Sequence, residues 1–266
     1  MFKIFSSKNK KSPYGWFGNY ASWQEVMASA KGYDAGNILN KTKDALLQVK
    51  NGTALYERDS MLFDQMEYPF PLLSCLFRSA SLLKRPLNIV DFGGSLGSTY
   101  FQVKDFIGPE VCASWNIVEQ EHYVTCGKEN FENDHLKFYP SIDACLQDKK
   151  IDLVLISGSV QYLPQPHLFL KQLADYNFNF LVFDRTAFHH GTEDRLTLQI
   201  VPPEIYEASY PSWFFNRDKF MAHFSEKYQL ICEFLPFVEG EAIMEIDHQP
   251  AGYNKGFYYI NTSLYA

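Results

Sequence analysis

The stretch LNIVDFGGSLGSTYF, residues 87–101, decides the fold because its pattern changes twice. It begins as a short apolar run, passes through an acid and three glycines, and ends in a helical pattern. Glycine permits positive φ and lets a ligand touch the backbone. In an open α/β sheet, a glycine turn between a strand and a helix lies at the edge where ligands bind. The sequence therefore predicts a ligand site at Asp91, Gly93, Gly94 and Gly97.

The order of residues in this turn narrows the kind of ligand. No Lys followed by Ser or Thr comes after Gly97, so the turn is not a P-loop. The order D-x-G-G-x-x-G also departs from the G-x-G-x-x-G of dinucleotide sites. An acid suits a ligand with an ammonium group better than a pyrophosphate. The methionine part of S-adenosylmethionine is such a ligand.

A second acid, Glu119, follows the next apolar run, in NIVEQ. A carboxylate at the end of that strand can accept hydrogen bonds from the ribose hydroxyls of an adenosine, although NAD uses the same device. The turn and the acid together indicate a nucleoside-bearing ligand. A tight turn with a surface glutamate is the alternative.

From residue 87 onward, short apolar runs alternate with longer helical patterns, which is typical of an α/β sheet. Strands are expected at 87–92, 115–120, 136–140, 151–157 and 178–184. Helices are expected at 95–108, 123–133, 142–148, 166–176 and 212–228. The runs 228–237 and 255–264 predict an antiparallel hairpin at the edge of the sheet.

The segment before residue 86 reads differently, with helical patterns at 23–34, 36–52 and 71–85. We therefore expect two parts, a helical N-terminal cap over residues 1–85 and an α/β domain over residues 86–266.

Composition narrows the class of protein. The formal charge of −7 argues against a nucleic-acid partner, which needs a concentrated basic surface. Five scattered cysteines fit neither a disulfide framework nor a zinc site. No run is long and apolar enough for a signal peptide or a transmembrane segment, so a cytoplasmic protein is expected. The basic residues near the start are Lys3, Lys8, Lys10 and Lys11.

The segments VDFGGSLGSTY, NIVEQ, IDLVLISGSVQYL and LVFDRT resemble class I S-adenosylmethionine-dependent methyltransferases. More narrowly, GWFGNYASWQEV, YERDS and DRLTLQIVPPEIYEASYPSWFF resemble a methyltransferase family associated with bacterial surface-polysaccharide biosynthesis. The resemblance covers nearly the whole chain. It implies a Rossmann-like fold with a mostly parallel sheet.

The resemblance also implies a set of cofactor contacts. Asp91, Gly93 and Gly97 would contact the methionine part, and Glu119 the ribose, with Gln120 beside it. The residues expected near adenine are Tyr139, Pro140 and Ser141. Those expected beside the sulfonium are Ser157, Gly158, Ser159 and Gln161. In YERDS, the resemblance favours a pocket wall over an exposed helix end.

Transfer of a methyl group to a hydroxyl benefits from a general base that accepts the hydroxyl proton. The candidates after the fifth strand are Asp184, His189 and His190, and the alternative for the two histidines is a polar loop doublet. Arg185 and Arg195 offer guanidinium forks for an anionic acceptor group, or form surface salt bridges.

An aromatic cluster, which includes Tyr210 and Trp213, either stacks on a sugar or starts a core helix. It comprises Tyr206, Tyr210, Trp213, Phe214 and Phe215. Side chains near the same loop offer oxygen ligands, which suit magnesium. Such a site would comprise Asp184, His189, Glu193 and Asp194. Their spacing fits no known metal loop, so no metal is predicted.

The sequence thus predicts an S-adenosylmethionine-dependent methyltransferase that acts on a hydroxyl of a sugar, a glycan precursor or a glycan chain end. Two alternatives stay open. One is a non-catalytic adapter that keeps the fold. The other is an NAD- or nucleotide-sugar-dependent enzyme on a related fold. The partner expected is a small-molecule or glycan acceptor, and the sequence indicates no oligomeric state.

Overall fold

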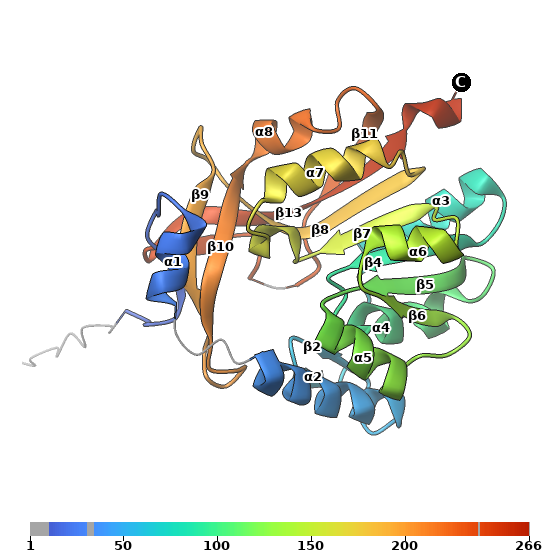
Figure 1. Ribbon diagram of the computed structural model, residues 1–266, viewed down its shortest axis with the longest axis horizontal. Helices are drawn as coiled ribbons and strands as arrows, with labels where there is room; N and C mark the ends of the chain where they lie inside the picture. Colours follow the sequence, from blue (N-terminus) through green and yellow to red (C-terminus); the bar gives the residue numbers. More distant parts are fainter. Residues whose placement is uncertain (1–10, 31–34, 239, 266) are drawn as a thin grey trace, which may run out of the picture.

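The computed structural model describes residues 11–30, 35–238 and 240–265, so Lys3, Lys8 and Lys10 lie outside the described residues. A large sheet runs through the molecule with helices on both of its faces (Figure 1). The α/β class expected from the sequence is confirmed. None of the helices in the described part of the chain is long and apolar enough to span a bilayer.

Five parallel strands form one half of the sheet, in the order β6-β5-β4-β7-β8. They are β4 (Leu87–Phe92), β5 (Cys112–Val118), β6 (Leu136–Tyr139), β7 (Leu153–Ser157) and β8 (Phe180–His189). The connecting helices are α4 (Ser98–Ile107), α5 (Glu121–Asn130), α6 (Ile142–Asp148) and α7 (Pro166–Asp175). All nine elements lie where the alternating pattern predicts them.

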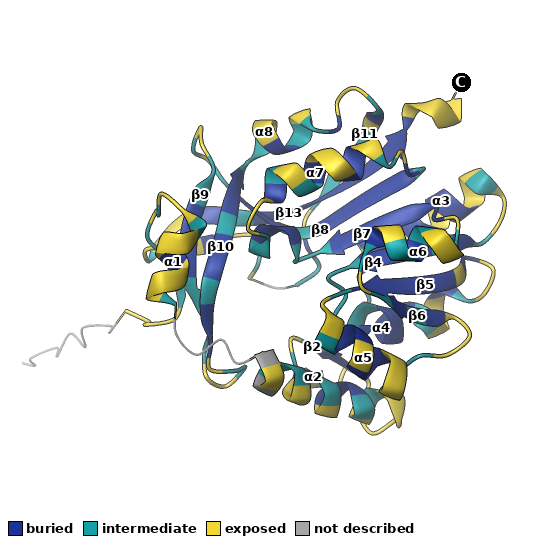
Figure 2. Ribbon diagram, in the orientation of Figure 1, coloured by how far each residue is buried: buried dark blue, intermediate teal, exposed yellow. Residues whose placement is uncertain are grey.

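Each buried strand feeds two cores because successive side chains point to opposite faces. On β4, Ile89 packs in the core under α3 (Phe70–Leu83), α4 and α5. The next residue, Val90, packs in the core under α6, α7 and α8 (Arg217–Ala222). The strands are buried along nearly their whole length (Figure 2), which explains their continuous apolar runs.

The strand order reverses at β4. The chain moves from β4 through α4 to β5 on one side, and β7 joins β4 on the other. Ligands of open α/β sheets bind in the crevice outside the carboxyl ends of the strands at such a reversal. Here that crevice lies between the residues after Phe92 and the residues after Ser157.

The other half of the sheet is mixed and closes on itself. It contains β1 (Gly15–Phe17), β9 (Arg195–Ile200), β10 (Ser209–Asn216), β11 (Tyr228–Phe234), β12 (Met244–Ile246) and β13 (Gln249–Asn261). The order β8-β13-β12-β1-β9-β10 returns to β8, which makes a barrel-like ring.

The expectation of a mostly parallel sheet therefore holds only from β4 to β8. The reason is that β13 pairs antiparallel with β8 from Phe180 to His189, and the last residues of β8 also pair with β10. The antiparallel pairing expected of the last two strands is confirmed, with β11 at the edge and β13 between β11 and β8.

The helix expected at 212–228 is wrong in its first half. Residues 209–216 form β10, and α8 begins only at Arg217. β10 pairs with β9 from Ser209 to Phe214 and so buries Phe214, while Phe215 is buried in the core under α8. The side chain of Asn216 accepts a hydrogen bond from the Lys219 N–H and caps α8.

The N-terminal segment does not form a single helical cap. β1 enters the ring, and α1 (Trp23–Ser29) packs on β9 and β10. α2 (Ala35–Lys50) lies beside a small hairpin, β2 (Tyr56–Arg58) and β3 (Met61–Phe63), at the end of the parallel half that carries the glycine turn (Figure 1). α3 covers the parallel sheet. The domain boundary near residue 86 stays a prediction.

Candidate functional site

A pocket opens at the crevice between β4 and β7. The glycine turn, the ends of β7 and β8, α4 and the β2–β3 hairpin supply its walls. Its lining includes Ile38, Thr42, Glu57, Arg58, Asp59, Ser60, Asp91, Gly93, Gly94, Ser95, Ser98, Thr99, Gln102, Tyr123, Ser157, Arg185, Tyr206 and Phe237. The pocket thus joins the predicted turn to the N-terminal hairpin.

The glycines of the turn are required by close contacts. A Cβ on Gly94 would lie 2.5 Å from Cγ of Asp91, so the turn packs directly on that carboxyl group. Gly93 has φ +72°, and a Cβ there would lie 2.5 Å from Cβ of Ser159. Gly97, at φ +103°, precedes the first residue of α4. Gly93 and Gly94 also line the pocket.

Asp91 is almost completely buried, at 1% exposure. The indole N–H of Trp115 donates to its Oδ2 at 3.0 Å. Burial raises the pKa of Asp91 to about 7, and the bond from Trp115 opposes that rise. A buried acid at the floor of a pocket gains from a cationic group on a ligand.

Glu119 lies next to the turn, as predicted, although it is not among the lining residues. Its Oε2 accepts from the Gln120 N–H at 2.8 Å. Burial raises the pKa of Glu119, and hydrogen bonds from the backbones of Gln120 and Ser95 oppose the rise. Ser141 caps α6 by accepting from the Ala144 N–H. Glu119, which the resemblance assigns to the ribose, thus contacts the turn through the backbone of Ser95.

The β2–β3 hairpin turns tightly at Asp59 and Ser60, whose φ angles are 52° and 66°. Two left-handed residues between paired strands are the geometry that twisted hairpins favour. The hairpin brings Glu57 over the start of α4, where its carboxylate accepts from the Ser98 hydroxyl. The Ser60 N–H donates to Oε2 of Glu57 at 3.0 Å.

Glu57 is 2% exposed and belongs to the pocket wall that YERDS was expected to form. Burial raises its pKa to about 7, against the lowering effect of the bonds from Ser98 and Ser60. The start of a helix carries a partial positive charge and free N–H groups, which attract anions. Glu57 supplies a carboxylate from the chain itself at that place.

Three predicted residues meet where the end of β7 lies beside the middle of β8. The Ser157 hydroxyl lies 3.4 Å from Oδ2 of Asp184, and the Arg185 N–H donates to Oδ1 at 2.9 Å. Burial raises the pKa of Asp184 to about 6, with Arg185 opposing the rise. Arg185 has φ 49° and Gly158 has φ 61°, and Arg185 lines the pocket.

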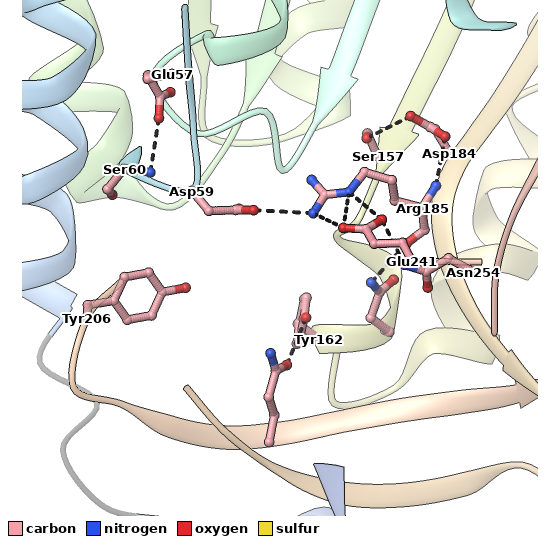
Figure 3. Close-up of polar contacts among 12 residues, drawn as sticks. Glu57, Asp59, Ser60, Ser157, Tyr162, Asp184, Arg185, Tyr206, Glu241 and Asn254 are labelled. Carbon is pink, nitrogen blue, oxygen red and sulfur yellow. Dashed lines mark hydrogen bonds and ion pairs between the residues drawn. The ribbon is translucent and has the colours of Figure 1, made fainter. Parts of the chain in front are cut away.

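The guanidinium of Arg185 joins two segments that are far apart in the sequence. Its Nε and Nη2 donate to the Glu241 carboxylate at 2.6–3.0 Å, and Nη2 lies 3.2 Å from Asp59. The Asn254 amide also donates to Glu241. Figure 3 shows Asp59 reaching from the hairpin toward Arg185 and Glu241. The fork expected to hold an anionic substrate is thus engaged by two carboxylates.

Tyrosines form another wall. Tyr206 lines the pocket, and its hydroxyl lies 3.1 Å from that of Tyr210. The ring of Tyr162 packs edge-on against Tyr210, and its hydroxyl donates to Gln199 at 2.9 Å (Figure 3). Trp213 donates to the Leu163 carbonyl and packs in the barrel half.

The predicted site residues that are not among the lining residues include Gly97, Glu119, Gln120, Ser141, Gly158, Asp184, His189, His190, Arg195, Tyr210 and Trp213. His189 contacts the Glu193 carbonyl at 2.6 Å through Nε2. His190 is exposed, with its ring against that of Tyr253. Arg195 donates to the Gly18 carbonyl and pairs with Asp247.

The side chains near the loop after β8 with oxygen ligands for magnesium have other partners. Asp194 contacts Nε2 of His167 at 2.6 Å, and Glu193 pairs with Lys219. Among the described residues, no group of three or more His, Cys, Asp or Glu side chains is placed to hold a metal ion.

Several pocket residues were not identified from the sequence. Ser98 stands in the motif itself and follows Gly97, so its place at the turn could have been predicted. Phe237 lines the pocket from the loop before β12, and nothing in the local pattern connects that residue to the turn. Glu241 and Tyr162 are not lining residues, but they contact Arg185 and Tyr210 beside the pocket.

The sequence matches no protein-family model and no curated protein. Solved structures similar to this chain include an S-adenosylmethionine-dependent methyltransferase from Clostridium acetobutylicum, at 8% identity, covering 71% of this chain and 89% of that chain, with a TM-score of 0.43. Another is the magnesium protoporphyrin IX methyltransferase of Synechocystis, solved with S-adenosylmethionine bound, at 11% identity, 71% and 78% coverage and a TM-score of 0.42.

A third is the 1,6-didemethyltoxoflavin-N1-methyltransferase of Burkholderia thailandensis, at 9% identity, 92% coverage of both chains and a TM-score of 0.40. Its structure holds S-adenosylhomocysteine and 1,6-didemethyltoxoflavin. Identities this low and TM-scores below 0.5 do not carry a substrate or an activity from those enzymes to this chain.

Proposed function

We propose that the protein is an S-adenosylmethionine-dependent methyltransferase. The observation that carries this proposal is the pair of buried acids at the glycine turn. Asp91 lies under the turn and Glu57 lies at the start of α4, and both line one pocket. S-adenosylmethionine carries an ammonium and a sulfonium group, which two carboxylates favour.

The same pair argues against the dinucleotide alternative. A dinucleotide site places the pyrophosphate at the start of the helix that follows the first strand. Here the Glu57 carboxylate contacts Ser98 at that position, and Asp91 is buried beside it. A pyrophosphate there would face two acids at short range, which is strongly unfavourable.

Different residues of this chain would bind different parts of the ligand. Asp91 would take the ammonium group, and the backbone of Gly93 and Gly94 would contact the methionine part. Glu119 would bind the ribose. Ser157 and Gly158, at the end of β7, would border the sulfonium. When bound, S-adenosylmethionine supplies an electrophilic methyl group, so the protein's task is to orient the acceptor and exclude water.

Of the three candidate bases, Asp184 is the one that lies beside the pocket. Its neighbours Ser157 and Arg185 both line the cavity. Its raised pKa, about 6, is closer to neutral pH than that of an exposed aspartate, which suits a base that accepts a proton from an acceptor hydroxyl. We therefore assign the proton-accepting role to Asp184 and give none to His189 or His190.

The acceptor that we propose is a hydroxyl of a sugar or glycan precursor. The resemblance to methyltransferases of surface-polysaccharide biosynthesis favours it. The Tyr206 ring on the pocket wall supports it, because aromatic rings stack on sugar faces. Arg185 and Arg195 are engaged with carboxylates and a carbonyl, so the acceptor needs no anionic group to pair with them.

Calorimetric titration of the full chain tests the proposal. S-adenosylmethionine and S-adenosylhomocysteine are the ligands, and NADH and UDP-glucose are the controls. We expect micromolar binding of the first pair alone, weakened at least about tenfold in Asp91→Asn and in Glu119→Gln. Asp105→Asn, which changes an exposed carboxylate on α4, should bind like the wild type.

Preference for NADH or UDP-glucose would overturn the proposal in favour of the related enzyme classes. Binding of the methyl donor without transfer of label to any of a panel of sugars and oligosaccharides would favour the adapter. In that case Asp184→Asn should leave the affinity for S-adenosylhomocysteine unchanged.

A further inference from the structure

Cys232 is an exposed thiol on β11, the strand at one edge of the sheet. Between Leu230 and Cys232 the pairing with β13 shifts by one residue, so Ile231 is the extra residue of a β-bulge. Side chains of a strand alternate between its two faces, and a bulge reverses that alternation for the residues that follow. Leu230 packs in the core under α7 and α8, and without the bulge Cys232 would point to the same face. The bulge therefore turns Cys232 to the face that α3 covers.

The register of β11 brings Cys232 to a second thiol. Cys232 lies directly opposite Tyr258 of β13, and residues in such a pair point to the same face. Tyr258 is buried under α3, where its hydroxyl lies 2.8 Å from the hydroxyl of Ser79. Cys75 stands four residues before Ser79, so both side chains lie on one face of α3. The thiol of Cys75 meets that of Cys232 and donates a hydrogen bond to it.

The two thiols differ in what can reach them. Cys232 is exposed, so a small molecule in solution can meet its Sγ. Burial raises the pKa of Cys232, and the guanidinium of Arg78 and the bond from Cys75 oppose that rise. Cys75 is only 3% exposed, and burial raises the pKa of its thiol. An oxidant in solution therefore reacts first at Cys232, and Cys75 reacts with the sulfur beside it.

We propose that Cys232 and Cys75 form a site of reversible oxidation, at which a small disulfide such as glutathione disulfide converts the two thiols into one disulfide. The Cys232 thiolate attacks one sulfur of glutathione disulfide, whose S–S bond breaks and releases one glutathione thiolate. Cys75 gives its proton to that thiolate, and its sulfur attacks Sγ of Cys232 and expels the second glutathione. Two protein thiols are thus oxidised, and one glutathione disulfide is reduced to two glutathiones.

The product would fasten the edge strand to α3. Among the described strands β11 pairs only with β13, so its other side is free to adjust to the geometry of a disulfide. A disulfide between residues far apart in the sequence constrains the unfolded chain and so stabilises the folded state. Neither cysteine lines the pocket at the glycine turn, so the oxidation does not depend on the proposed function.

The test equilibrates the full chain in buffers with graded ratios of reduced to oxidised glutathione. Iodoacetamide then blocks the free thiols, and mass spectrometry maps the digested peptides. We expect the peptides that hold Cys75 and Cys232 to become linked as the oxidised share rises, and dithiothreitol to separate them. The oxidised protein should also unfold at a urea concentration higher by about 1 M or more. Both measurements use the wild type, so misfolding of a variant cannot confuse them.

Variants then assign the two steps. In Cys75→Ala the reaction should stop at the mixed disulfide, with one glutathione on Cys232. In Cys232→Ser, Cys75 should stay free, because glutathione does not reach the buried thiol. Cys126→Ala, which changes a buried cysteine on α5, is the matched control and should form the link at the same glutathione ratios as the wild type.

Three outcomes would overturn the proposal. The first is a wild type that keeps glutathione on Cys232 while Cys75 stays free, which would mean that the two sulfur atoms do not bridge. The second is a link between the Cys232 residues of two chains, or a link that forms only in urea. The third is the absence of any oxidation at every glutathione ratio. None of these results bears on the binding of a methyl donor, which calorimetry tests separately.

Discussion

Burial in the fold raises the free energy of the ionised forms of Asp91 and Glu57. Both pKa values are raised to about 7 by burial, which means that the folded state disfavours the charged carboxylates. The stability of the folded state therefore depends on pH. Below the ordinary carboxyl pKa both states are protonated and nothing is lost. As the pH rises through about 4 to 7, the unfolded chain ionises first and the folded state loses stability.

Ligand affinity should follow the opposite course. A ligand ammonium group pairs with ionised Asp91, so affinity should rise with pH until that acid is fully charged. We expect S-adenosylhomocysteine to bind about tenfold more tightly at pH 8 than at pH 6, for a carboxyl group that titrates near 7. 5′-Methylthioadenosine has no ammonium group and should vary far less. Parallel calorimetric titrations measure both, and an equal pH response of the two ligands would contradict the pairing.

Gly93 and Gly52 form a matched pair of glycines with nearly equal φ angles, +72° and +75°. A Cβ on Gly52 meets nothing within 4 Å, so Gly52→Ala should lose only about 1–2 kcal/mol for the left-handed backbone. A Cβ on Gly93 would collide with Ser159, so Gly93→Ala should lose about 1–3 kcal/mol more and should weaken ligand binding. Urea denaturation compares them. Equal losses would mean that the turn can move away from Ser159.

Among the elements, β4 and β7 are locked together at their starts by an ion pair. Asp152 is fully buried, and it accepts from Arg85 at 2.6 and 2.8 Å and from the Asn88 N–H at 2.9 Å. Removing Arg85 leaves that buried acid with fewer donors. The pair therefore positions the two strands whose opposite ends border the pocket.

Arg85→Met should lower the free energy of unfolding by about 1–3 kcal/mol, because hydrogen bonds to a buried charge are lost. Lys104→Met, which removes an ion pair with the exposed Asp105, should change it by less than about 0.5 kcal/mol. Urea denaturation of both variants measures the difference. A small effect of Arg85→Met would indicate that the bond from Asn88 alone holds Asp152.

At the scale of elements, the sequence predicted the parallel half well because each strand there carries its own signal. A strand buried on both faces must be apolar along its length, and a glycine turn or a capping residue marks its end. β10 failed this test because SWFFN reads equally well as the start of a helix. Its pairing with β9 makes it a strand, and β9 lies outside the short stretch of sequence from which a helix or a strand is predicted.

Across the whole molecule, Arg185 connects the N-terminal hairpin to the loop before β12. It pairs with Asp59 on one side and with Glu241 on the other. Phe237 of that same loop packs on Arg58 of the hairpin. The two segments thus cover the pocket together, and neither has another described ion pair that joins it to the floor of the pocket.

Arg185→Met should loosen both segments at once. We expect faster amide hydrogen exchange in residues 56–63 and in residues 235–238 and 240–243, with the parallel strands unchanged. Lys219→Met, which removes an exposed ion pair with Glu193, is the control and should alter neither segment. Hydrogen exchange followed by mass spectrometry measures this. Faster exchange in only one segment would show that Arg185 does not couple them.

The site was predictable to the extent that its residues follow strand ends. Asp91 and Ser157 stand at or near the ends of β4 and β7, and Asp184 pairs with Ser157 on the neighbouring parallel strand, so the alternating pattern brings them together. His189 and His190 do not lie at the pocket because β8 does not end there. It continues past Arg185 into the ring and carries the histidines away. Glu241 and Phe237 depend on tertiary contacts that no local pattern records.

The walls of the pocket come from Ile38 near one end of the chain to Phe237 near the other. Chains are made from the N-terminus onward, and domains fold as their residues emerge. A nascent chain that stops before Phe237 already holds the glycine turn and Asp91, yet it lacks the loop that covers them. A ligand that needs all the walls would therefore bind only after Phe237 has been made, so its binding would not guide the folding steps of the residues that emerge before that loop.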